Sequence, residues 1–339
     1  MLKLRRIFVI ISILLVWGSP VSALDSFFKD KTMRIIVGSS PGGGYDTYSR
    51  VISRHMGKHI PGNPTIIVEN KPGAGFLIAA NHMYKVAKPD GLTIGNFIGG
   101  LFLQQLLGKP GIEFDSRKFE YVGAPAQDNY MCGVSKTLGI TSAEQWLASK
   151  TPVKIGGVGA GSGTDDIPRV LAATIGLPIQ LVTGYKGTAD VRLAFDSGEV
   201  QGVCNAWESS KTSWRKELDS GDILILLQTI AKPHPDLPKV PLSISFAKTD
   251  EARKLIQVGV HDFAATARPY VLPPGTPKDR VQILRKAFSE TLKDPEFLAD
   301  ANRAKLDINP LTGAELERIV LGIYKLEPHL VAKLKEVLK

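Results

Sequence analysis

The sequence predicts an α/β protein with two lobes, each built on a doubly wound sheet. Three observations support this prediction. Short apolar runs alternate with helical patterns in βαβ order, the alternation occurs twice along the chain, and glycine-rich loops follow several of the apolar runs. A chain of 339 residues is long enough for two such units.

The first unit begins after residue 30. Its apolar runs are short and bounded by glycine, proline and asparagine, as strands are, and its helical stretches repeat apolar residues at helical spacing. We expect strands at 33–37, 65–69 and 92–97, and helices at 47–59 and 75–86.

The second unit repeats this order after a separating segment at 121–134. A further apolar run at 223–229 is predicted to return the chain toward the first unit. We expect strands at 153–156, 179–181 and 202–205, and helices at 167–175 and 188–197.

The rest of the chain is predicted to rejoin the first lobe. A proline-rich passage at 233–241 precedes the turn PPGTP, which starts a helix at 278–293. Asp294-Pro295 ends that helix and begins another, and Thr312 with Glu315 forms a capping box for the last long helix. We therefore expect lobe I at 30–124 plus 231–339 and lobe II at 125–230, joined by two crossing segments that act as a hinge.

The N-terminus has the pattern of a secretory signal peptide. Three basic residues precede a short apolar run, and the small residues Val21-Ser22-Ala23 follow it. The run is shorter than the roughly 20 residues that span a bilayer, so we expect cleavage after Ala23 and export; an uncleaved anchor is the alternative. Removal of residues 1–23 lowers the formal net charge from +9 to +6. The basic residues form no run or stripe, which argues against nucleic acid as a partner.

The chain has two cysteines, Cys132 and Cys204, and no zinc-binding spacing. An exported protein can join such a pair in a disulfide. Both cysteines lie in apolar stretches of the sequence, which instead favours two buried free thiols, and this is what we predict.

Four loops rich in glycine follow predicted strands, two in each lobe. Glycine lets the backbone approach a ligand closely, and a helix N-terminus offers unpaired N–H groups. Because ligands of open α/β sheets bind beyond the carboxyl ends of the strands, the loops are expected to converge on a small anion such as a dicarboxylate. Each loop alone could be an ordinary capped turn. They are SSPGGGYD at 39–46, ENKPGAG at 69–75, GGVGAGSGTD at 156–165 and TGYKGT at 183–188.

Other chemistries find little support. The chain lacks the Walker pattern, the third glycine of a Rossmann fingerprint after Gly159, and the two glycines that a nucleophile elbow needs around Ser162. His55 and His59 have helical spacing for a metal, but without the HExxH glutamate a plain helical pair is the better interpretation. Asp165 and Asp166 fit a helix cap better than an acid–base pair.

Several of these motifs resemble one family. The stretches RIIVGSSPGGGYD at 34–46 and IVENKPGAG at 67–75 are similar to Bug-type, or TctC-type, substrate-binding receptors of tripartite tricarboxylate transporters, as are KPDGLTI at 88–94, YKGT at 185–188 and LPPGTP at 272–277. The resemblance covers nearly the whole mature chain. It implies two lobes of the type II periplasmic-binding-protein class that close on a ligand, with no catalysis, cofactor or metal.

The resemblance also implies the ligand, its site and its partners. Small carboxylates are expected to bind to backbone amides, hydroxyls and bridging waters in a periplasmic monomer that delivers them to permease subunits. The residues expected to line this site are Gly42, Gly43, Gly44, Tyr45, Asp46, Gly73, Ala74, Ser162, Gly163, Thr164, Tyr185, Thr188, Asn205 and Trp207.

The chain departs from the family pattern at two places in lobe II. Asp165 stands where the family often has histidine, and it would repel an anion unless it caps the helix and points away. Asn205 stands where the family often has aspartate, and Trp207 after it could stack on a ligand or fill the hinge. Two other functions stay open: a periplasmic sensor that signals to a kinase, and an exported hydrolase that uses Ser162 or Asp166.

Overall fold

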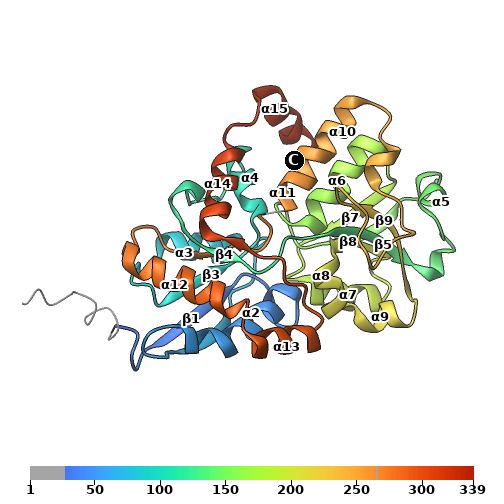
Figure 1. Ribbon diagram of the computed structural model, residues 1–339. Coiled ribbons are helices and arrows are strands. Elements are labelled where there is room, and N and C mark those ends of the chain that lie inside the picture. The colour runs from blue at the N-terminus through green and yellow to red at the C-terminus, as the bar shows by residue number, and fades with distance from the viewer. Residues whose placement is uncertain (1–26, 265) are drawn as a thin grey trace, which may run out of the picture.

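The computed structural model describes residues 27–264 and 266–339. Its two β-sheets lie in separate bodies, which we call lobe I and lobe II (Figure 1). The predicted signal peptide at 1–23 lies outside the described residues. Within the described ranges, every helix is too short or too polar to cross a membrane.

Lobe I contains a six-stranded sheet in the order β11-β4-β10-β3-β1-β2. Strand β1 lies between β2 and β3 and is parallel to both, whereas β10 lies between β3 and β4 and is antiparallel to both. The strands are β1 (Thr32–Val37), β2 (Thr65–Asn70), β3 (Thr93–Asn96), β4 (Glu120–Ala124), β10 (Tyr270–Leu272) and β11 (Leu311–Thr312).

Lobe II contains a five-stranded sheet in the order β7-β6-β8-β5-β9. Strand β6 is parallel to β7 and β8, and β5 is antiparallel to both of its neighbours, β8 and β9. The strands are β5 (Tyr130–Ser135), β6 (Val153–Gly157), β7 (Ile179–Thr183), β8 (Gly202–Ala206) and β9 (Ile223–Thr229).

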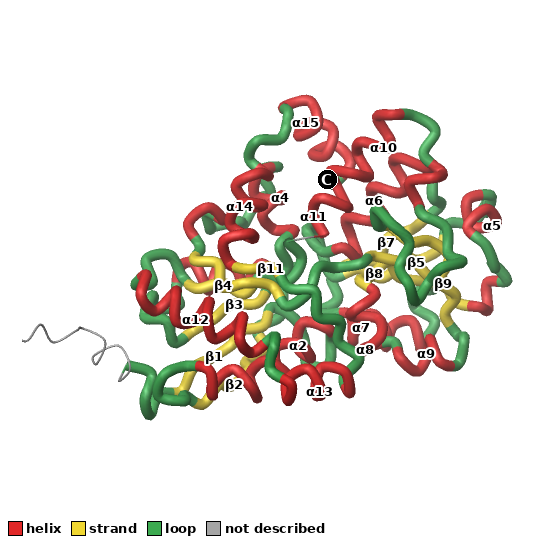
Figure 2. Tube along the Cα trace, in the orientation of Figure 1, coloured by secondary structure: helices red, strands yellow, loops and turns green. Residues whose placement is uncertain are grey.

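Helices cover both sheets, and Figure 2 shows them in red around the yellow strands. Around the sheet of lobe I lie α2 (Gly44–Met56), α3 (Leu77–Lys85), α4 (Gly100–Leu106), α12 (Lys278–Thr291), α13 (Pro295–Arg303) and α14 (Gly313–Ile323). Around the sheet of lobe II lie α5 (Ala143–Leu147), α6 (Gly163–Ile175), α7 (Thr188–Asp196), α8 (Trp207–Ser213), α9 (Arg215–Asp219), α10 (Asp250–Ile256), α11 (Asp262–Ala264) and α15 (Pro328–Val337). Short helical turns complete the set: η1 (Gly57–His59), η2 (Ser116–Lys118), η3 (Lys136–Leu138), η4 (Ser243–Phe246) and η5 (Gln257–His261).

Two helices begin closer to the glycine loops than the sequence predicts. Helix α2 begins at Gly44 and α6 at Gly163, three and four residues before the predicted starts. The first free N–H groups of both helices therefore belong to the loops themselves. The predicted capping box is present, with Thr312 and Glu315 bonded to each other's backbone at the start of α14.

The segment at 121–134, predicted only as a separator, holds two strands. Strand β4 belongs to the lobe I sheet, residues 125–129 cross over, and β5 joins the lobe II sheet between β8 and β9. The chain returns through residues 266–269 into β10. A further passage leads from α14, which packs on β4, to α15, whose Leu330 and Leu334 join the core of lobe II.

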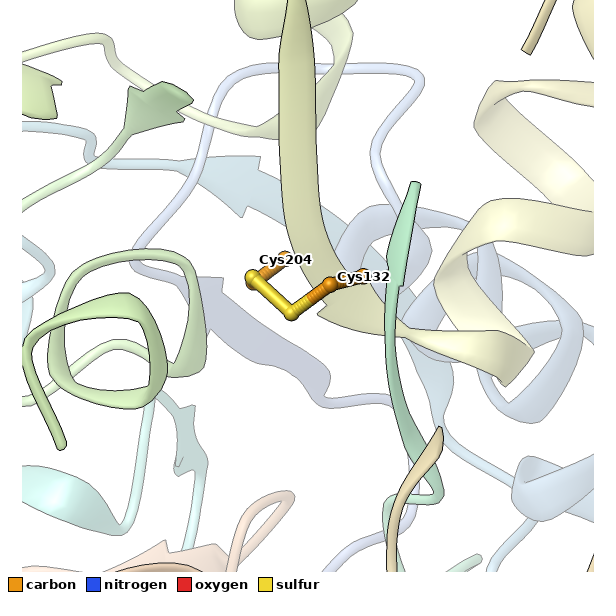
Figure 3. Close-up of a disulfide and its surroundings, with 2 residues drawn as sticks. All are labelled: Cys132 and Cys204. Carbon is orange, nitrogen blue, oxygen red and sulfur yellow. A yellow bond between two sulfur atoms is a disulfide. The ribbon is translucent and has the colours of Figure 1, made fainter. Parts of the chain in front are cut away.

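The two cysteines form a disulfide, so the prediction of two free thiols is wrong. Cys132 on β5 lies directly opposite Cys204 on β8, and their sulfur atoms are bonded (Figure 3). Both residues are fully buried, as expected from their apolar runs. The sequence could not show that the two runs are paired strands in this register, because 72 residues separate the cysteines.

Candidate functional site

A small cavity lies between the two lobes. It encloses about 30 Å³, far less than the roughly 300–1,000 Å³ of typical small-molecule sites. The lobes are therefore closed on each other in this structure, and they must open for a ligand of several atoms to enter. The cavity is lined by Ser39, Gly44, Tyr45, Phe76, Ile98, Asp128, Tyr130, Val158, Ser162, Gly163, Thr164, Thr188, Asn205, Ala206 and Ser209.

The cavity lies beyond strand ends of both sheets. Ser39 follows β1, Val158 follows β6, and Ala206 ends β8. The first residues of three helices also line it: Gly44 of α2, Gly163 of α6 and Thr188 of α7. Because the N-terminal N–H groups of a helix carry partial positive charge, three such ends at one cavity favour a negatively charged group.

Two glycines let the walls of the cavity approach each other. A Cβ atom on Gly44 would lie 2.2 Å from Ser209 Oγ, across the lobe boundary. A Cβ atom on Gly163 would lie 2.2 Å from the ring of Tyr130. Any side chain at either position would push the walls of the cavity away from each other.

Hydrogen bonds join the loops of the two lobes around the cavity. Ser40 Oγ donates to Asp190 Oδ2 at 2.5 Å, and the backbone N–H of Ser40 donates to the Lys186 carbonyl at 3.2 Å. At a second place, Gln104 Nε2 donates to Asp166 Oδ2 at 3.1 Å. These bonds connect groups that would face water if the lobes separated, so they stabilise the closed form.

A buried ion pair joins the two crossing segments beside the cavity. Arg268 Nε donates to Asp128 Oδ1 at 2.5 Å, and the two side chains are 1% and 2% exposed. The guanidinium group lies over the rings of Tyr45 and Tyr48, at 4.8 and 4.7 Å from their centroids, and also donates to Ser209 Oγ. Burial raises the pKa of Asp128, and the charge of Arg268 lowers it.

Residues 49–321 match the family described as "Tripartite tricarboxylate transporter family receptor". The chain belongs to this family. Its members are substrate-binding receptors and not enzymes, so the alternative of an exported hydrolase is not supported.

The receptor is similar to curated and solved proteins. A Cupriavidus necator protein, "UPF0065 protein in gbd 5'region", is 26% identical over 296 residues, which are 86% of this chain and 83% of that protein. The solved periplasmic binding protein BugD has a TM-score of 0.73 at 20% identity, covering 91% of this chain and 98% of BugD.

Two further solved structures contain ligands. MatC from Rhodopseudomonas palustris with bound malate has a TM-score of 0.71 at 19% identity and covers 92% of this chain and all of MatC. Rpa4515 from R. palustris with adipate has a TM-score of 0.73 at 21% identity and covers 91% of this chain and 98% of that protein. At these identities the likeness establishes the two-lobe fold.

The structure brings half of the sequence-predicted site residues of the receptor to the cavity and places the others around it. Those that line it are Gly44, Tyr45, Ser162, Gly163, Thr164, Thr188 and Asn205. Those outside its lining are Gly42, Gly43, Asp46, Gly73, Ala74, Tyr185 and Trp207.

Three of the outer residues have partners of their own. Asp46 accepts the backbone N–H of Gly42 and the Nδ2 of Asn70, so it shapes the first glycine loop. Tyr185 donates to Glu199, and Trp207 Nε1 donates to Asp236. The indole of Trp207 is thus anchored on the chain that follows β9.

The acidic pair at the start of α6 caps its own loop. Asp165 accepts the Gly159 N–H at 2.7 Å and the Thr183 hydroxyl, and Asp166 accepts the Gly161 N–H at 3.0 Å. Neither carboxylate lines the cavity. Burial raises the pKa of Asp166 to about 7, because few donors compensate the lost water.

Eight lining residues were not predicted as site residues from the sequence, and four of them have polar side chains: Ser39, Asp128, Tyr130 and Ser209. Ser39 lies within the first glycine loop and could have been included on that ground. Asp128 and Tyr130 follow the first crossing segment, and Ser209 lies on α8. The sequence offered one signal for Asp128: it is the single aspartate of the segment 121–134, which separates the two predicted units.

One cluster has the residue types of a metal site. The ligand atoms of Glu208, His234 and Asp307 lie within 4.8 Å of one another. However, Lys211 Nζ lies 2.5 Å from Asp307 Oδ2, so an ammonium group already balances this charge. The two histidines predicted as a helical pair bond to carboxylates instead: His55 to Asp300 in α13, and His59 to Asp294, the N-cap of α13.

Proposed function

We propose that the receptor binds a small organic carboxylate between its lobes in the periplasm and delivers it to the membrane permease of a tripartite transporter. One observation supports this proposal above all. The cavity is bounded by loops from the strand ends of both sheets, so a ligand there contacts both lobes at once.

The lining suits a carboxylate. Three helix N-termini supply N–H groups, and Ser39, Ser162, Thr164 and Thr188 supply hydroxyls. The structural relatives with malate and adipate have this fold, which supports a small carboxylate as the ligand of this receptor.

Ligand binding and lobe closure would be one event. The open form admits the ligand, and the closed form surrounds it with donors from both lobes. A ligand that bridges the lobes has more contacts in the closed form than in the open form, and it therefore shifts the population toward closure. The permease would then distinguish the loaded closed receptor from the open one.

Location and partners follow from the proposal. The predicted signal peptide would direct the chain to the periplasm, where the disulfide can form. We propose that the receptor acts there as a monomer, without a cofactor, and meets the permease subunits through its closed lobes. Co-purification of the cross-linked receptor with the permease subunits would test this partnership.

A ligand screen tests the binding proposal. The purified mature chain is titrated by calorimetry with mono-, di- and tricarboxylates, and its thermal unfolding is followed with each. A ligand at about one hundred times its Kd is expected to stabilise the fold by about 2.7 kcal/mol. The ligand is recovered unchanged afterwards. If the folded protein binds no carboxylate of the panel, the proposal is wrong.

A further inference from the structure

We infer that closure of the lobes places a proton on Asp166, so that the receptor takes up a proton together with its ligand and releases both when it opens. The inference rests on the proposed function, because it concerns the closure that a ligand brings about. It adds to that function a coupling between ligand affinity and pH.

Asp166 lies at the contact between the lobes. It is in the first turn of α6 in lobe II and is 2% exposed. From α4 of lobe I, the equally buried Gln104 donates Nε2 to Asp166 Oδ2 at 3.1 Å. This hydrogen bond, and the burial of the carboxylate against α4, therefore exist only while the lobes are together.

The backbones of the two lobes meet tightly beside this bond. A Cβ atom on Gly100, the first residue of α4, would overlap the carbonyl oxygen of Gly161. A Cβ atom on Gly161 would lie 3.2 Å from Gln104 Cγ. Contacts this close leave no room for water between α4 and the loop before α6. Separation of the lobes would admit water to the Asp166 carboxylate.

The Asp166 carboxylate has few partners that offset its burial. Burial raises its pKa to about 7, and the like charge of Asp165 adds to this rise. Three groups oppose the rise: the N–H of Gly161, which donates to Oδ1 at 3.0 Å, the Gln104 amide, and the charge of Lys109. Lys109 has the weakest effect of the three, and its Nζ donates to a backbone carbonyl at 3.1 Å.

Other charged groups around α6 are engaged elsewhere. Arg169, one turn after Asp166, donates Nη1 to the Lys339 carbonyl at 2.8 Å. On η5, which packs against α6, His261 Nδ1 lies 3.4 Å from Gln257 Oε1. An arginine of α10 and a lysine of α15 pair with carboxylates of their own helices.

The closed structure suits the protonated form of Asp166. When Oδ2 carries the proton, a half-turn of the Gln104 amide presents Oε1 as the acceptor, so the bond between the lobes is kept. In the open form water reaches the carboxylate, and its pKa returns toward the ordinary value of 3.8. Between these two pH values, closure therefore binds a proton from the solvent.

Ligand affinity should depend on pH as a result. A group whose pKa is higher in the closed form favours closure at low pH and ceases to favour it as pH rises through the closed-form value. Affinity should therefore fall by about fourfold between pH 6.5 and 8.5. Ligand binding should take up about 0.75 proton at pH 6.5 and almost none at pH 8.5.

Calorimetry with malate and with adipate measures both quantities. The carboxyl groups of these probes are ionised over this range, so the protein supplies the titration. Each probe is titrated at pH 6.5, 7.5 and 8.5, in buffers that differ in ionisation enthalpy, because the heat then reports the number of protons taken up.

A pair of variants assigns the proton to Asp166. At pH 6.5, Asp166→Asn should lose about 0.75 proton of the uptake and the fourfold change in affinity. Glu217→Gln is the matched control, because Glu217 is equally buried but pairs with Arg192 within lobe II. Its proton uptake should equal that of the natural chain.

The outcomes are distinct. An affinity that does not change with pH, or an equal proton uptake in folded Asp166→Asn, would overturn the inference while the receptor function stands. If no carboxylate of the panel binds, the proposed function fails and the free chain decides the inference. Small-angle scattering should then show a larger radius of gyration at pH 8.5 than at pH 5.5, because the ratio of closed to open form falls by about thirtyfold. An equal radius at both pH values would overturn it.

A second variant keeps the test available if Asp166→Asn does not fold. Gln104→Met removes the donor from lobe I but keeps the size of the side chain, so the pKa of Asp166 in the closed form should rise further. The pH at which affinity declines should then move upward, whereas a purely structural role of Gln104 would lower affinity equally at every pH. An unchanged midpoint would overturn the inference. Circular dichroism and a cooperative melt establish folding before each titration.

Discussion

Ser40 Oγ donates a hydrogen bond of 2.5 Å to Asp190 Oδ2, although the two residues are 150 positions apart and belong to different lobes. Ser40 is in the first glycine loop, and Asp190 is in the first turn of α7. The bond lies beside the cavity, where Thr188 from the same turn forms part of the wall. This hydrogen bond can therefore form only when the two lobes are closed on each other.

The Ser40→Ala substitution should weaken ligand binding and leave folding unchanged. A hydrogen bond to a charged group contributes about 1.5–3 kcal/mol, so a loss of about tenfold to a hundredfold in affinity is expected. Calorimetry with the best ligand of the panel measures it. Ser53→Ala on the exposed side of α2 is the control, since Ser53 Oγ only donates to the carbonyl of Arg50. Equal affinity of both variants would contradict a role of Ser40 in closure.

The Gly44→Ala substitution should hold the lobes apart. Its Cβ would lie 2.2 Å from Oγ and 2.8 Å from Cβ of Ser209 on the other lobe, so the clash exists only in the closed form. We expect a loss of affinity of more than tenfold, with little change in the melting temperature of the free protein. Small-angle scattering with saturating ligand should show a larger radius of gyration than for the natural chain.

Gly322→Ala is the matched control for this experiment. Gly322 also lies in a helix, α14, and a Cβ there meets nothing within 4 Å. This variant should bind and close normally. Normal closure in Gly44→Ala would mean that the contact between α2 and α8 is not part of the closed form in solution.

The Cys132–Cys204 disulfide should stabilise lobe II substantially. It closes a long loop across two paired strands, and loss of such a bond typically costs about 2–5 kcal/mol. Urea unfolding of the natural chain, with and without reductant, measures the difference. The variant with both cysteines replaced by serine should match the reduced protein and show no further effect of reductant. A stability independent of reductant in the natural chain would contradict the disulfide.

The free energy of unfolding should decrease as pH rises from 4 to 7, because Asp166 titrates in this range. Burial raises the pKa of Asp166 from 3.8 to about 7, so in this range the folded chain holds a proton that the unfolded chain has released. The free energy of unfolding therefore decreases as pH rises, by at most about 1.4 kcal/mol per pH unit, and the contribution levels off above pH 7.

Asp166→Asn removes this titration. Its free energy of unfolding, measured in urea at pH 5, 6, 7 and 8, should increase relative to the natural chain as pH rises. Asp219→Asn serves as the control, because the Asp219 side chain is largely exposed. A difference between Asp166→Asn and the natural chain that does not vary with pH would show that Asp166 does not titrate in this range.

Some of the site was predictable because its signals are local. The glycines at 42–44 and 159–163 mark turns between a strand and a helix, and such a turn is visible in a few consecutive residues. Thr312 and Glu315, three residues apart, likewise showed a capping box that is present. Gly44, Tyr45, Ser162, Gly163 and Thr164 lie in these loops, the resemblance to the family placed them at the site, and they line the cavity.

Other features depended on residues far apart in the chain. Arg268 and Asp128 are 140 positions apart, and neither stands in a motif that indicates the other. The apolar runs around Cys132 and Cys204 predicted burial correctly, but their direct opposition depends on the register of β5 against β8. Trp207 showed no sign in the sequence of its bond to Asp236.

The sequence by itself determined most strands and helices of the two βαβ units, the positions of the glycine loops and the resemblance to a receptor family, because periodicity, turn residues and motifs act over a few neighbouring positions. Only the tertiary structure decided which loops share a cavity, that Asp128 and Arg268 form a buried ion pair beside it, and that the cysteines are joined. Those facts depend on how the two sheets and the segments that cross between them pack together, and such packing is set by many weak long-range contacts that no single stretch of sequence contains.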